Sequence, residues 1–123
     1  METLNNTTLE ARINDLNSMI QAGQIMEAFE KYYADDITMQ ENEDELRIGK
    51  AANRVHEEAF AGNITEFRKG DVKNVIVSDN ITVVEWDFDF THKEWGVRNY
   101  TQIAVQRWNA DGQIINEKFY YNN

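Results

Sequence analysis

The spacing of hydrophobic residues in this 123-residue chain changes at Gly62. Before Gly62, except in a short alternating stretch at residues 37–42, apolar residues recur every three or four positions, which is the spacing of one buried face of an α-helix. After it they recur every second position, as in strands that bury one face. Residues 81–92 show this alternation most clearly, because aromatic residues such as Trp86 and Phe88 fall on a single face. Helices followed by strands predict an α+β fold, in which helices cover the apolar face of a curved antiparallel sheet.

Capping, glycine and turn signals set the limits of the expected elements. Thr7 and Glu10 have the spacing of a capping box, so a first helix runs from there to Gly23. A second helix carries residues 25–33, and a third lies between Gly49 and Gly62. The apolar positions of the third helix are Ala51, Ala52, Val55, Ala59 and Phe60. The expected strands cover residues 37–42, 64–77, 81–92, 97–108 and 114–121. Turns are expected at Asp79-Asn80 and Asp111-Gly112, and the strand at 64–77 has a possible break at Gly70.

Composition narrows the functional classes. The chain carries 12 Lys and Arg residues against 22 Asp and Glu residues, so neither nucleic acid nor an anionic membrane is an expected partner. It has no cysteine, which excludes disulfides, thiolate nucleophiles and Cys-based zinc sites. The length predicts one domain spanning residues 1–123. No signal peptide or long apolar run is visible, so we expect a cytoplasmic protein, and no cofactor is predicted.

Short motifs along the chain resemble one known superfamily. Residues 33–36 (Tyr-Ala-Asp-Asp) precede the first strand, residues 49–51 (Gly-Lys-Ala) open the third helix, and residues 108–114 lead into residues 119–121 (Phe-Tyr-Tyr). In this order they resemble the nuclear transport factor 2-like superfamily, specifically its SnoaL-like branch, over nearly the whole chain. The resemblance implies a cystatin-like, ketosteroid isomerase-like α+β barrel, with three N-terminal helices packed on the sheet around a cone-shaped pocket. This fold serves isomerases, cyclases, hydrolases, dehydratases and non-catalytic binding modules.

Turn geometry and alternation together predict which side chains face this pocket. A two-residue turn at Asp111-Gly112 sets one register for the flanking strands, whereas a bulged three-residue turn would shift it. The two-residue register pairs Trp108 with Ile115, Gln106 with Glu117, Ala104 with Phe119 and Gln102 with Tyr121. The predicted pocket, suited to a small apolar or aromatic molecule, consists of Met39, Glu41, Trp86, Phe88, Gln102, Gln106, Glu117, Phe119 and Tyr121, with His56 from the third helix.

Glu41 is the first candidate for catalysis. In ketosteroid isomerases, the aromatic-Ala-Asp-Asp motif is followed by a strand that carries the general base, and Glu41 matches that position by resemblance. A carboxylate in an aromatic pocket has its charged form disfavoured, so the pKa of Glu41 is expected to rise into a useful range. The alternative is a structural carboxylate at a strand end, solvated or paired with Arg47 or Lys50.

Other parts of the related active sites are missing from this sequence. By resemblance, the isomerase Tyr that stabilises the dienolate falls near Leu16, and the protonated Asp falls on Ala104. Steroid isomerisation is therefore not expected, because each lost donor typically removes a few kcal/mol of transition-state stabilisation. The limonene epoxide hydrolase pattern also fails, since its Arg-x-Asp pair matches Trp86 and Phe88, and its last-strand Asp matches Phe119.

Glu117 is the second candidate, as a further acid or base opposite Gln106. The alternative is a structural acid held by Gln106, Tyr121 or His56. His56 has no second histidine one helical turn away, so a half-buried structural histidine is the main expectation there. A metal site formed by Glu41, His56 and Glu117 is a minor alternative, and no metal site is predicted. His92 lies near a hairpin tip and is expected to be exposed.

The outer face of the sheet is expected to carry an acidic stripe of Glu85, Asp87 and Asp89, with Arg107 and Lys118 on neighbouring strands to offset its charge. The resemblance implies a homodimer through this face. The leading prediction is a small-molecule pocket protein, working as a proton-transfer lyase, isomerase or cyclase with a pocket carboxylate as base. The alternative is a non-catalytic ligand-binding or dimerisation module of the same fold, so the sequence leaves open whether the protein is an enzyme.

Overall fold

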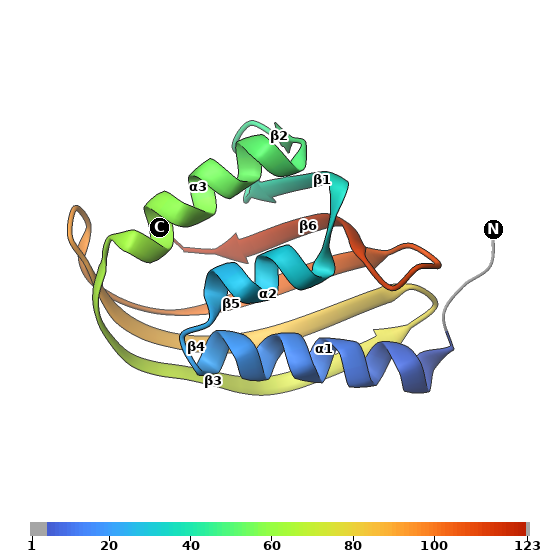
Figure 1. Ribbon diagram of the computed structural model, residues 1–123. Coiled ribbons are helices and arrows are strands. Elements are labelled where there is room, and N and C mark those ends of the chain that lie inside the picture. Colours follow the sequence, from blue (N-terminus) through green and yellow to red (C-terminus); the bar gives the residue numbers. More distant parts are fainter. Residues whose placement is uncertain (1–4, 123) are drawn as a thin grey trace.

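The computed structural model describes residues 5–122, which form three helices and one six-stranded sheet. The elements are α1 (Asn6–Gln21), α2 (Ile25–Tyr32), β1 (Tyr33–Glu41), β2 (Arg47–Ile48), α3 (Lys50–Gly62), β3 (Ile64–Ser78), β4 (Ile81–His92), β5 (Gly96–Trp108) and β6 (Ile114–Tyr121). The helices lie on one face of the sheet, which curves around them (Figure 1). This arrangement confirms the predicted α+β fold. Among the described residues, no helix combines the length and apolar character needed to cross a membrane.

The strand order differs from the sequence prediction at one pair. The order is β2-β1-β6-β5-β4-β3, and β1 runs parallel to β6 while every other neighbouring pair is antiparallel. The expectation of a wholly antiparallel sheet is therefore wrong, and the sheet stays open between its edge strands β2 and β3 instead of closing into a barrel. The parallel pairing places Met39 beside Glu117, and Glu41 beside Phe119.

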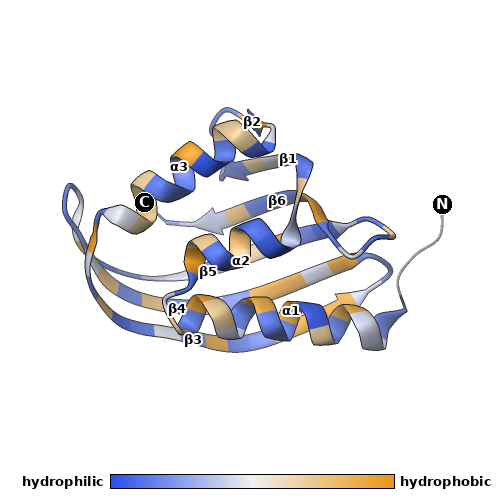
Figure 2. Ribbon diagram, in the orientation of Figure 1, coloured by the Kyte–Doolittle hydropathy of each residue, from blue (hydrophilic) through white to orange (hydrophobic). Residues whose placement is uncertain are grey.

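The core lies between α1, α2 and the sheet. Leu9, Ile13 and Leu16 share one face of α1 and are at most 1% exposed. They pack in one cluster with Phe29 of α2 and Trp108 of β5. Figure 2 shows these hydrophobic positions as interruptions in an otherwise polar α1. Burial of one helical face at this spacing is what the three-to-four-residue period predicted.

The first helix has its N-cap two residues earlier than the capping-box prediction. The Asn5 side chain accepts a hydrogen bond from the backbone N–H of Thr8 at 2.8 Å, so Asn5 is the N-cap and the predicted Thr7–Glu10 capping box is wrong. Asparagine is at least as good a cap as threonine, because its side-chain oxygen reaches the same orphan N–H groups. Gly23 follows the helix with a φ of +80°, as expected for a glycine that ends a helix.

The face of α3 that packs inward is not its alanine-rich face. The buried residue of α3 is Asn53, whose amide N–H₂ donates to the backbone carbonyls of Arg47 and Gly49. Its side-chain oxygen accepts a hydrogen bond from the Arg47 Nε–H, so Asn53 links the start of α3 to β2. Val55 is 71% exposed as a result. The other apolar positions of α3 that point to solvent are Ala51, Ala52 and Ala59.

The long strands follow the period-two prediction closely. β3 passes through Gly70 without a break, and a Cβ atom at that position would lie 2.6 Å from the Phe67 ring. Glycine is therefore needed there for close packing and not as a chain break. Asp79 and Asn80 both have positive φ values, of +46° and +70°, which is the backbone of a tight hairpin turn.

The hairpin between β5 and β6 has the predicted register except at its end. Gln106 pairs with Glu117, Ala104 with Phe119 and Gln102 with Tyr121, as predicted, but Trp108 pairs with Ile114 and not with Ile115. The cause is a bulge next to the loop, where the Asn109 side chain accepts from the backbone N–H groups of Asp111 and Gln113. The extra residue of the bulge lies before Asn116, so the pairing from Asn116 onward and the inward face of β6 are as predicted.

The acidic stripe on β4 is offset by β3. Arg68 pairs with Asp89 at 2.9 Å, and Lys73 pairs with Asp87 at 3.5 Å. Lys118 instead pairs with Glu43 at 3.1 Å. The predicted offset by Arg107 and Lys118 is therefore wrong, because the antiparallel neighbour β3 presents its basic residues directly beside β4.

Candidate active site

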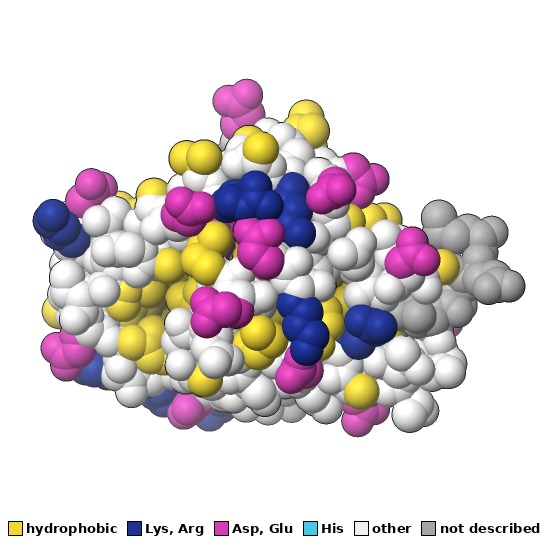
Figure 3. Space-filling view, viewed as in Figure 1, with side chains coloured by type: hydrophobic (Ala, Val, Ile, Leu, Met, Phe, Trp, Pro, Cys, Tyr) yellow, Lys and Arg dark blue, Asp and Glu magenta, His cyan; other side chains and the backbone are white. Residues whose placement is uncertain are grey.

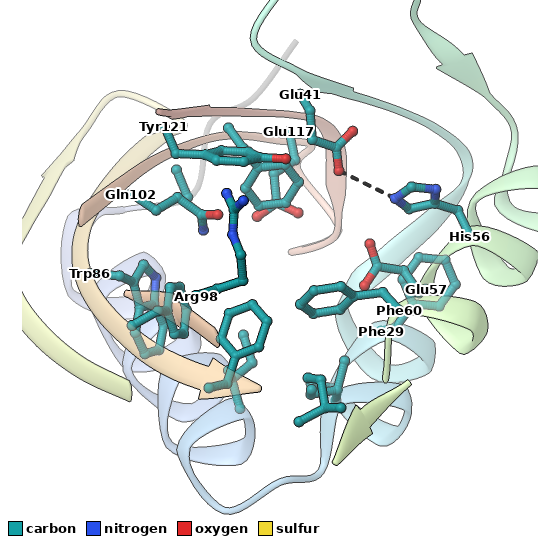
Figure 4. Close-up of a pocket in the computed structure, with 18 of the residues that line it drawn as sticks. Phe29, Glu41, His56, Glu57, Phe60, Trp86, Arg98, Gln102, Glu117 and Tyr121 are labelled. Carbon is teal, nitrogen blue, oxygen red and sulfur yellow. Dashed lines mark ion pairs between the residues drawn. The ribbon is translucent and has the colours of Figure 1, made fainter. Parts of the chain in front are cut away.

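A cavity of about 460 Å³ lies between the helices and the curved sheet. Its walls are mainly aromatic, and Figure 4 shows these rings around a central space with a few polar groups directed into it. The aromatic lining residues are Phe29, Tyr33, Phe60, Phe67, Trp86, Phe88, Phe90, Trp95, Tyr100, Phe119 and Tyr121. A concave apolar space with a small number of convergent polar side chains is the usual form of a small-molecule site.

The structure brings the predicted pocket residues together with one exception. The lining residues that the sequence predicted are Glu41, His56, Trp86, Phe88, Gln102, Gln106, Glu117, Phe119 and Tyr121. Met39 does not line the cavity and is 1% exposed within the hydrophobic core. Its prediction is wrong because the bulk of α2 and α3 packs onto that part of β1 and fills the space above it.

Glu117 is a deeply buried polar group of the cavity wall, at 2% exposure. Its Oε1 accepts a hydrogen bond from the Tyr33 hydroxyl at 2.5 Å, and its Oε2 accepts from the Gln106 side-chain amide at 2.7 Å. Burial raises the pKa of Glu117 to about 7, although these two hydrogen bonds act in the opposite direction. Both donors are neutral, so no cation compensates the charge of this carboxylate directly.

The Gln106 amide is held by a second pair of residues. The Trp108 indole N–H donates to the Thr82 hydroxyl at 2.9 Å, and that hydroxyl donates to Gln106 Oε1 at 2.6 Å. An indole N–H can only donate, and the hydroxyl that accepts from it gives its own proton to Gln106 Oε1. The amide N–H₂ of Gln106 is therefore turned toward Glu117, where it favours an acceptor carboxylate.

Glu41 is engaged in an ion pair with Arg47, which is the alternative that the sequence left open and not the free base of the leading prediction. Arg47 reaches both carboxylate oxygens, at 2.5 and 3.1 Å, and His56 Nε2 lies 3.4 Å from Oε1 (Figure 4). Burial alone would raise the pKa of Glu41, but the contacts with His56 and Arg47 outweigh it and lower the pKa to about 2. The expected rise is therefore wrong, because β2 and α3 place two basic groups against this carboxylate.

Glu57 is a cavity residue that sequence reasoning missed. It lies on the face of α3 that also carries Asn53 and Phe60, and its side chain points into the space opposite Gln102 and Trp86 (Figure 4). Burial raises the pKa of Glu57 to about 7. The available signal was the spacing of Asn53, Glu57 and Phe60 at four and three residues, but the competing alanine spacing hid it.

The cavity mouth lies beside the β4–β5 hairpin. Trp95 stacks on His92 with ring centroids 3.8 Å apart, and Phe60 of α3 packs against both rings. His92 is 2% exposed, so its predicted exposure is wrong; the Trp95 ring covers it. Arg98 lies over the Tyr100 ring at 5.4 Å on the same side. Figure 3 shows hydrophobic side chains gathered on this part of the surface.

Leu16 and Ala104 occupy the positions where the isomerase resemblance expected hydrogen-bond donors, and both line the cavity as apolar residues. Stabilisation of a dienolate by those two positions is therefore absent. Within residues 5–122, no three His, Cys, Asp or Glu side chains form a group that could hold a metal ion. Glu41, His56 and Glu117 thus do not form the metal site that the sequence left open.

The chain is similar to known proteins in both sequence and structure. The sequence pattern of the SnoaL-like domain family matches residues 6–121. No protein of curated function matches the chain. Among solved structures, a Mesorhizobium loti protein named as a candidate SnoaL-like polyketide cyclase, with carbohydrate phosphatase as a second name, is 26% identical, with a TM-score of 0.80 over 92% of this chain and 98% of that one.

Two further solved structures are similar at lower identity. A candidate SnoaL-like polyketide cyclase from Jannaschia sp. CCS1 is 11% identical, with a TM-score of 0.80 over 99% of this chain and 90% of that one. Bal32a, from a soil-derived mobile gene cassette, is 10% identical, with a TM-score of 0.78 over 96% of this chain and 92% of that one. At these identities the likeness shows the shared fold alone.

Proposed function

The chain belongs to the SnoaL-like domain family of the nuclear transport factor 2-like superfamily, and from this premise we propose that it catalyses proton transfer on a small, mainly apolar carbonyl compound, with Glu117 as the general base. The reaction class is that of a cyclase, isomerase or lyase. The observation that supports it most strongly is a cavity-facing carboxylate that is 2% exposed and held by two neutral donors.

The pKa and the orientation of the Glu117 carboxylate both suit a general base. A general base works best when its pKa lies near the working pH, because it is then both deprotonated and basic enough to take a proton. Burial brings the pKa of Glu117 to about 7, which meets that condition. Its two hydrogen bonds fix the carboxylate orientation, and orientation of the reacting groups lowers the activation barrier further.

Glu41 does not meet the same condition. Its pKa of about 2 makes it a weak base, and Arg47 occupies both of its oxygens. We therefore assign Glu41 a structural role, and the base of the proposed reaction moves from β1 to β6. Two of the similar structures are named as candidate polyketide cyclases, which agrees with chemistry on carbonyl compounds but does not identify the substrate of this chain.

The experiment uses 2-tetralone, an aromatic ketone with exchangeable α-protons and a size suited to the cavity. Exchange of its α-protons in D₂O is followed by NMR with the wild-type protein, Glu117→Gln and Glu58→Gln. Glu117→Gln should reduce the protein-catalysed exchange on the order of 10²-fold or more, since general bases contribute 10²–10⁴ in rate. Glu58 is exposed on α3 and does not line the cavity, so Glu58→Gln is the matched control and should stay within a few-fold of wild type.

A non-catalytic ligand-binding module is the competing function. It predicts that 2-tetralone binds without faster exchange, and that Glu117→Gln changes affinity but no rate. Saturation-transfer NMR on the same samples measures binding independently of exchange. Binding with no rate enhancement in the wild-type protein would favour this alternative.

A homodimer through the outer face of the sheet remains a separate proposal. Ile76 is 61% exposed there and lies in a shallow groove with Val83 and Ile103. Exposed aliphatic residues on a sheet face favour contact with a second copy. Replacing Ile103 by Asp should then shift the protein to monomers in sedimentation-velocity measurements, whereas an unchanged mass would contradict the dimer.

A further inference from the structure

Glu57 is a cavity carboxyl that takes no part in the proton abstraction proposed for Glu117. Among the described residues, no hydrogen bond or ion pair holds its carboxyl group, in contrast to Glu41 and Glu117. It comes from α3, whereas Glu117 comes from β6, so the two carboxyl groups belong to different walls of one space (Figure 4). A carboxyl group without a protein partner inside an aromatic cavity is available to a bound molecule.

We infer that Glu57 is the catalytic acid of the site, which donates its proton to the carbonyl oxygen of an enolisable ketone while Glu117 removes the α-proton. This inference rests on the proposed function. It also narrows the substrate class to ketones whose oxygen and α-carbon can contact Glu57 of α3 and Glu117 of β6 at the same time.

The protonation states follow from the surroundings of the two groups. Glu117 accepts two hydrogen bonds, from Tyr33 and Gln106, which stabilise its charged form. Glu57 has no such donor, and burial raises its pKa to about 7. The two carboxyls also repel each other when both are charged. When they share one proton, Glu57 carries it and Glu117 is the carboxylate.

Other charged groups around Glu57 act in both directions. His56 on its own helix and Arg47 of β2 favour the charged form of Glu57, whereas Glu41 of β1 disfavours it. Because Arg47 is already committed to Glu41 through two contacts, its effect on Glu57 is largely cancelled. Glu57 and Glu117 repel each other when both are charged, and the two hydrogen bonds to Glu117 favour the charge there, so a proton shared by the pair lies on Glu57.

The step balances without a cofactor. Glu117 takes the α-proton, and the C–H electron pair forms the C=C bond of the enol. The carbonyl π-electrons move to oxygen, which takes the proton of Glu57. The enol, a protonated Glu117 and a charged Glu57 result. The reverse transfer returns a proton to the same carbon, or to a conjugated one, which gives exchange in the first case and isomerisation in the second.

The test compares pH profiles of 2-tetralone exchange for the wild type, Glu57→Gln and the exposed neighbour variant Glu58→Gln. The wild-type rate should rise with the ionisation of Glu117 and fall with that of Glu57, which gives a bell shape. Glu57→Gln should lower the rate about 10- to 100-fold and remove the falling limb, because glutamine cannot ionise. Glu57→Asp should restore the falling limb in part, and Glu58→Gln should match the wild type.

The outcomes separate the two claims. Exchange that is lost in Glu117→Gln but is unchanged in Glu57→Gln, with its falling limb intact, overturns the role of Glu57 and leaves the base in place. No exchange by the wild-type protein overturns the proposed function and this inference together. Circular dichroism of each variant at the assay pH ensures that a lost rate reflects chemistry and not unfolding.

Discussion

The indole N–H of Trp108 is connected to the carboxylate of Glu117 through the side chains of Thr82 and Gln106. Every member of this chain is at most 2% exposed. The three hydrogen bonds run in one direction: the indole donates to the hydroxyl, the hydroxyl to the amide oxygen, and the amide N–H₂ to the carboxylate. The hydrophobic core thereby sets the orientation of the amide that contacts the candidate base.

Among these four residues, Thr82 can be replaced with the smallest change of side-chain shape, and its replacement interrupts the hydrogen-bond network. Thr82→Val leaves the Trp108 N–H and Gln106 Oε1 buried without their partner, which should lower the free energy of unfolding by about 1–3 kcal/mol. Urea unfolding measures this. Thr101→Val is the control, because its hydroxyl bonds Asp87 at an exposed site, and a change within about 0.5 kcal/mol is expected. Equal losses in the two variants would contradict the importance of the chain.

Tyr33 controls the charge state of Glu117. Tyr33→Phe keeps the ring that stacks on Phe29 but removes the hydroxyl that donates to the carboxylate. Since that hydrogen bond lowers the pKa of Glu117, its loss should raise the pKa further above its value of about 7. Titration by ¹³C NMR of the Glu117 carboxyl carbon measures the change. Tyr32→Phe, which removes a hydroxyl bonded to Asp15 outside the cavity, should leave the pKa of Glu117 unaltered.

Stability should fall as the pH rises from acid to neutral because of Glu117. Its pKa is raised from 4.5 to about 7 in the folded protein, so between these values the folded state holds a proton that the unfolded state has released. The stabilisation is complete below pH 4.5 and is lost as the pH rises through 7. The difference in the free energy of unfolding between Glu117→Gln and wild type should move in favour of the variant by on the order of 1–3 kcal/mol from pH 5 to pH 8. Urea unfolding at each pH measures this difference. If the free energy of unfolding changed with pH in the same way in both proteins, this contribution of Glu117 would be ruled out.

The contribution of the Glu41–Arg47 pair to stability should depend on pH in the opposite direction to that of Glu117. Since the pKa of Glu41 is lowered from 4.5 to about 2, its contribution is present above pH 4.5 and is lost as the pH falls toward 2. Arg47→Met should lower the free energy of unfolding at neutral pH by on the order of 2 kcal/mol, because it leaves a half-buried carboxylate without its partner. The same variant should lose less stability on acidification, as urea unfolding at several pH values would show.

The matched control for that pair is Lys118→Met. Lys118 pairs with Glu43, whose side chain is 88% exposed, and exposed pairs typically contribute less than 1 kcal/mol. Its unfolding free energy should therefore remain close to that of wild type at every pH. An Arg47→Met protein as stable as Lys118→Met would contradict a structural role for the Glu41–Arg47 pair.

The inward face of β6 was predictable from the sequence because two independent signals agreed. Strand alternation and a short turn both placed Glu117 opposite Gln106, and the observed register matches. The bulge at Trp108 escaped prediction because it depends on the Asn109 side chain, which bonds the backbone within its own loop. One extra residue was absorbed before Glu117, so the candidate base kept its orientation.

The face of α3 was not predictable in the same way. Its alanine spacing and the spacing of Asn53, Glu57 and Phe60 are both helical, and period alone does not choose between them. The choice was made by the hydrogen bonds of Asn53 to Arg47 and Gly49, and by a cavity that accommodates polar groups. For this reason Glu57 was missed and Val55 was wrongly grouped with buried positions.

The sequence by itself determined the α+β class, the long strands and most of the cavity lining, because these follow from local hydrophobic period and turn chemistry. Tertiary structure alone decided the protonation chemistry of the site. The parallel pairing of β1 with β6 and the packing of β2 and α3 gave Glu41 a cation and Glu117 two neutral donors, and left Glu57 without a partner among residues 5–122. The pKa of a carboxyl depends on burial and on neighbours distant in the chain, so three glutamates that look alike in sequence acquire different roles only in the folded protein.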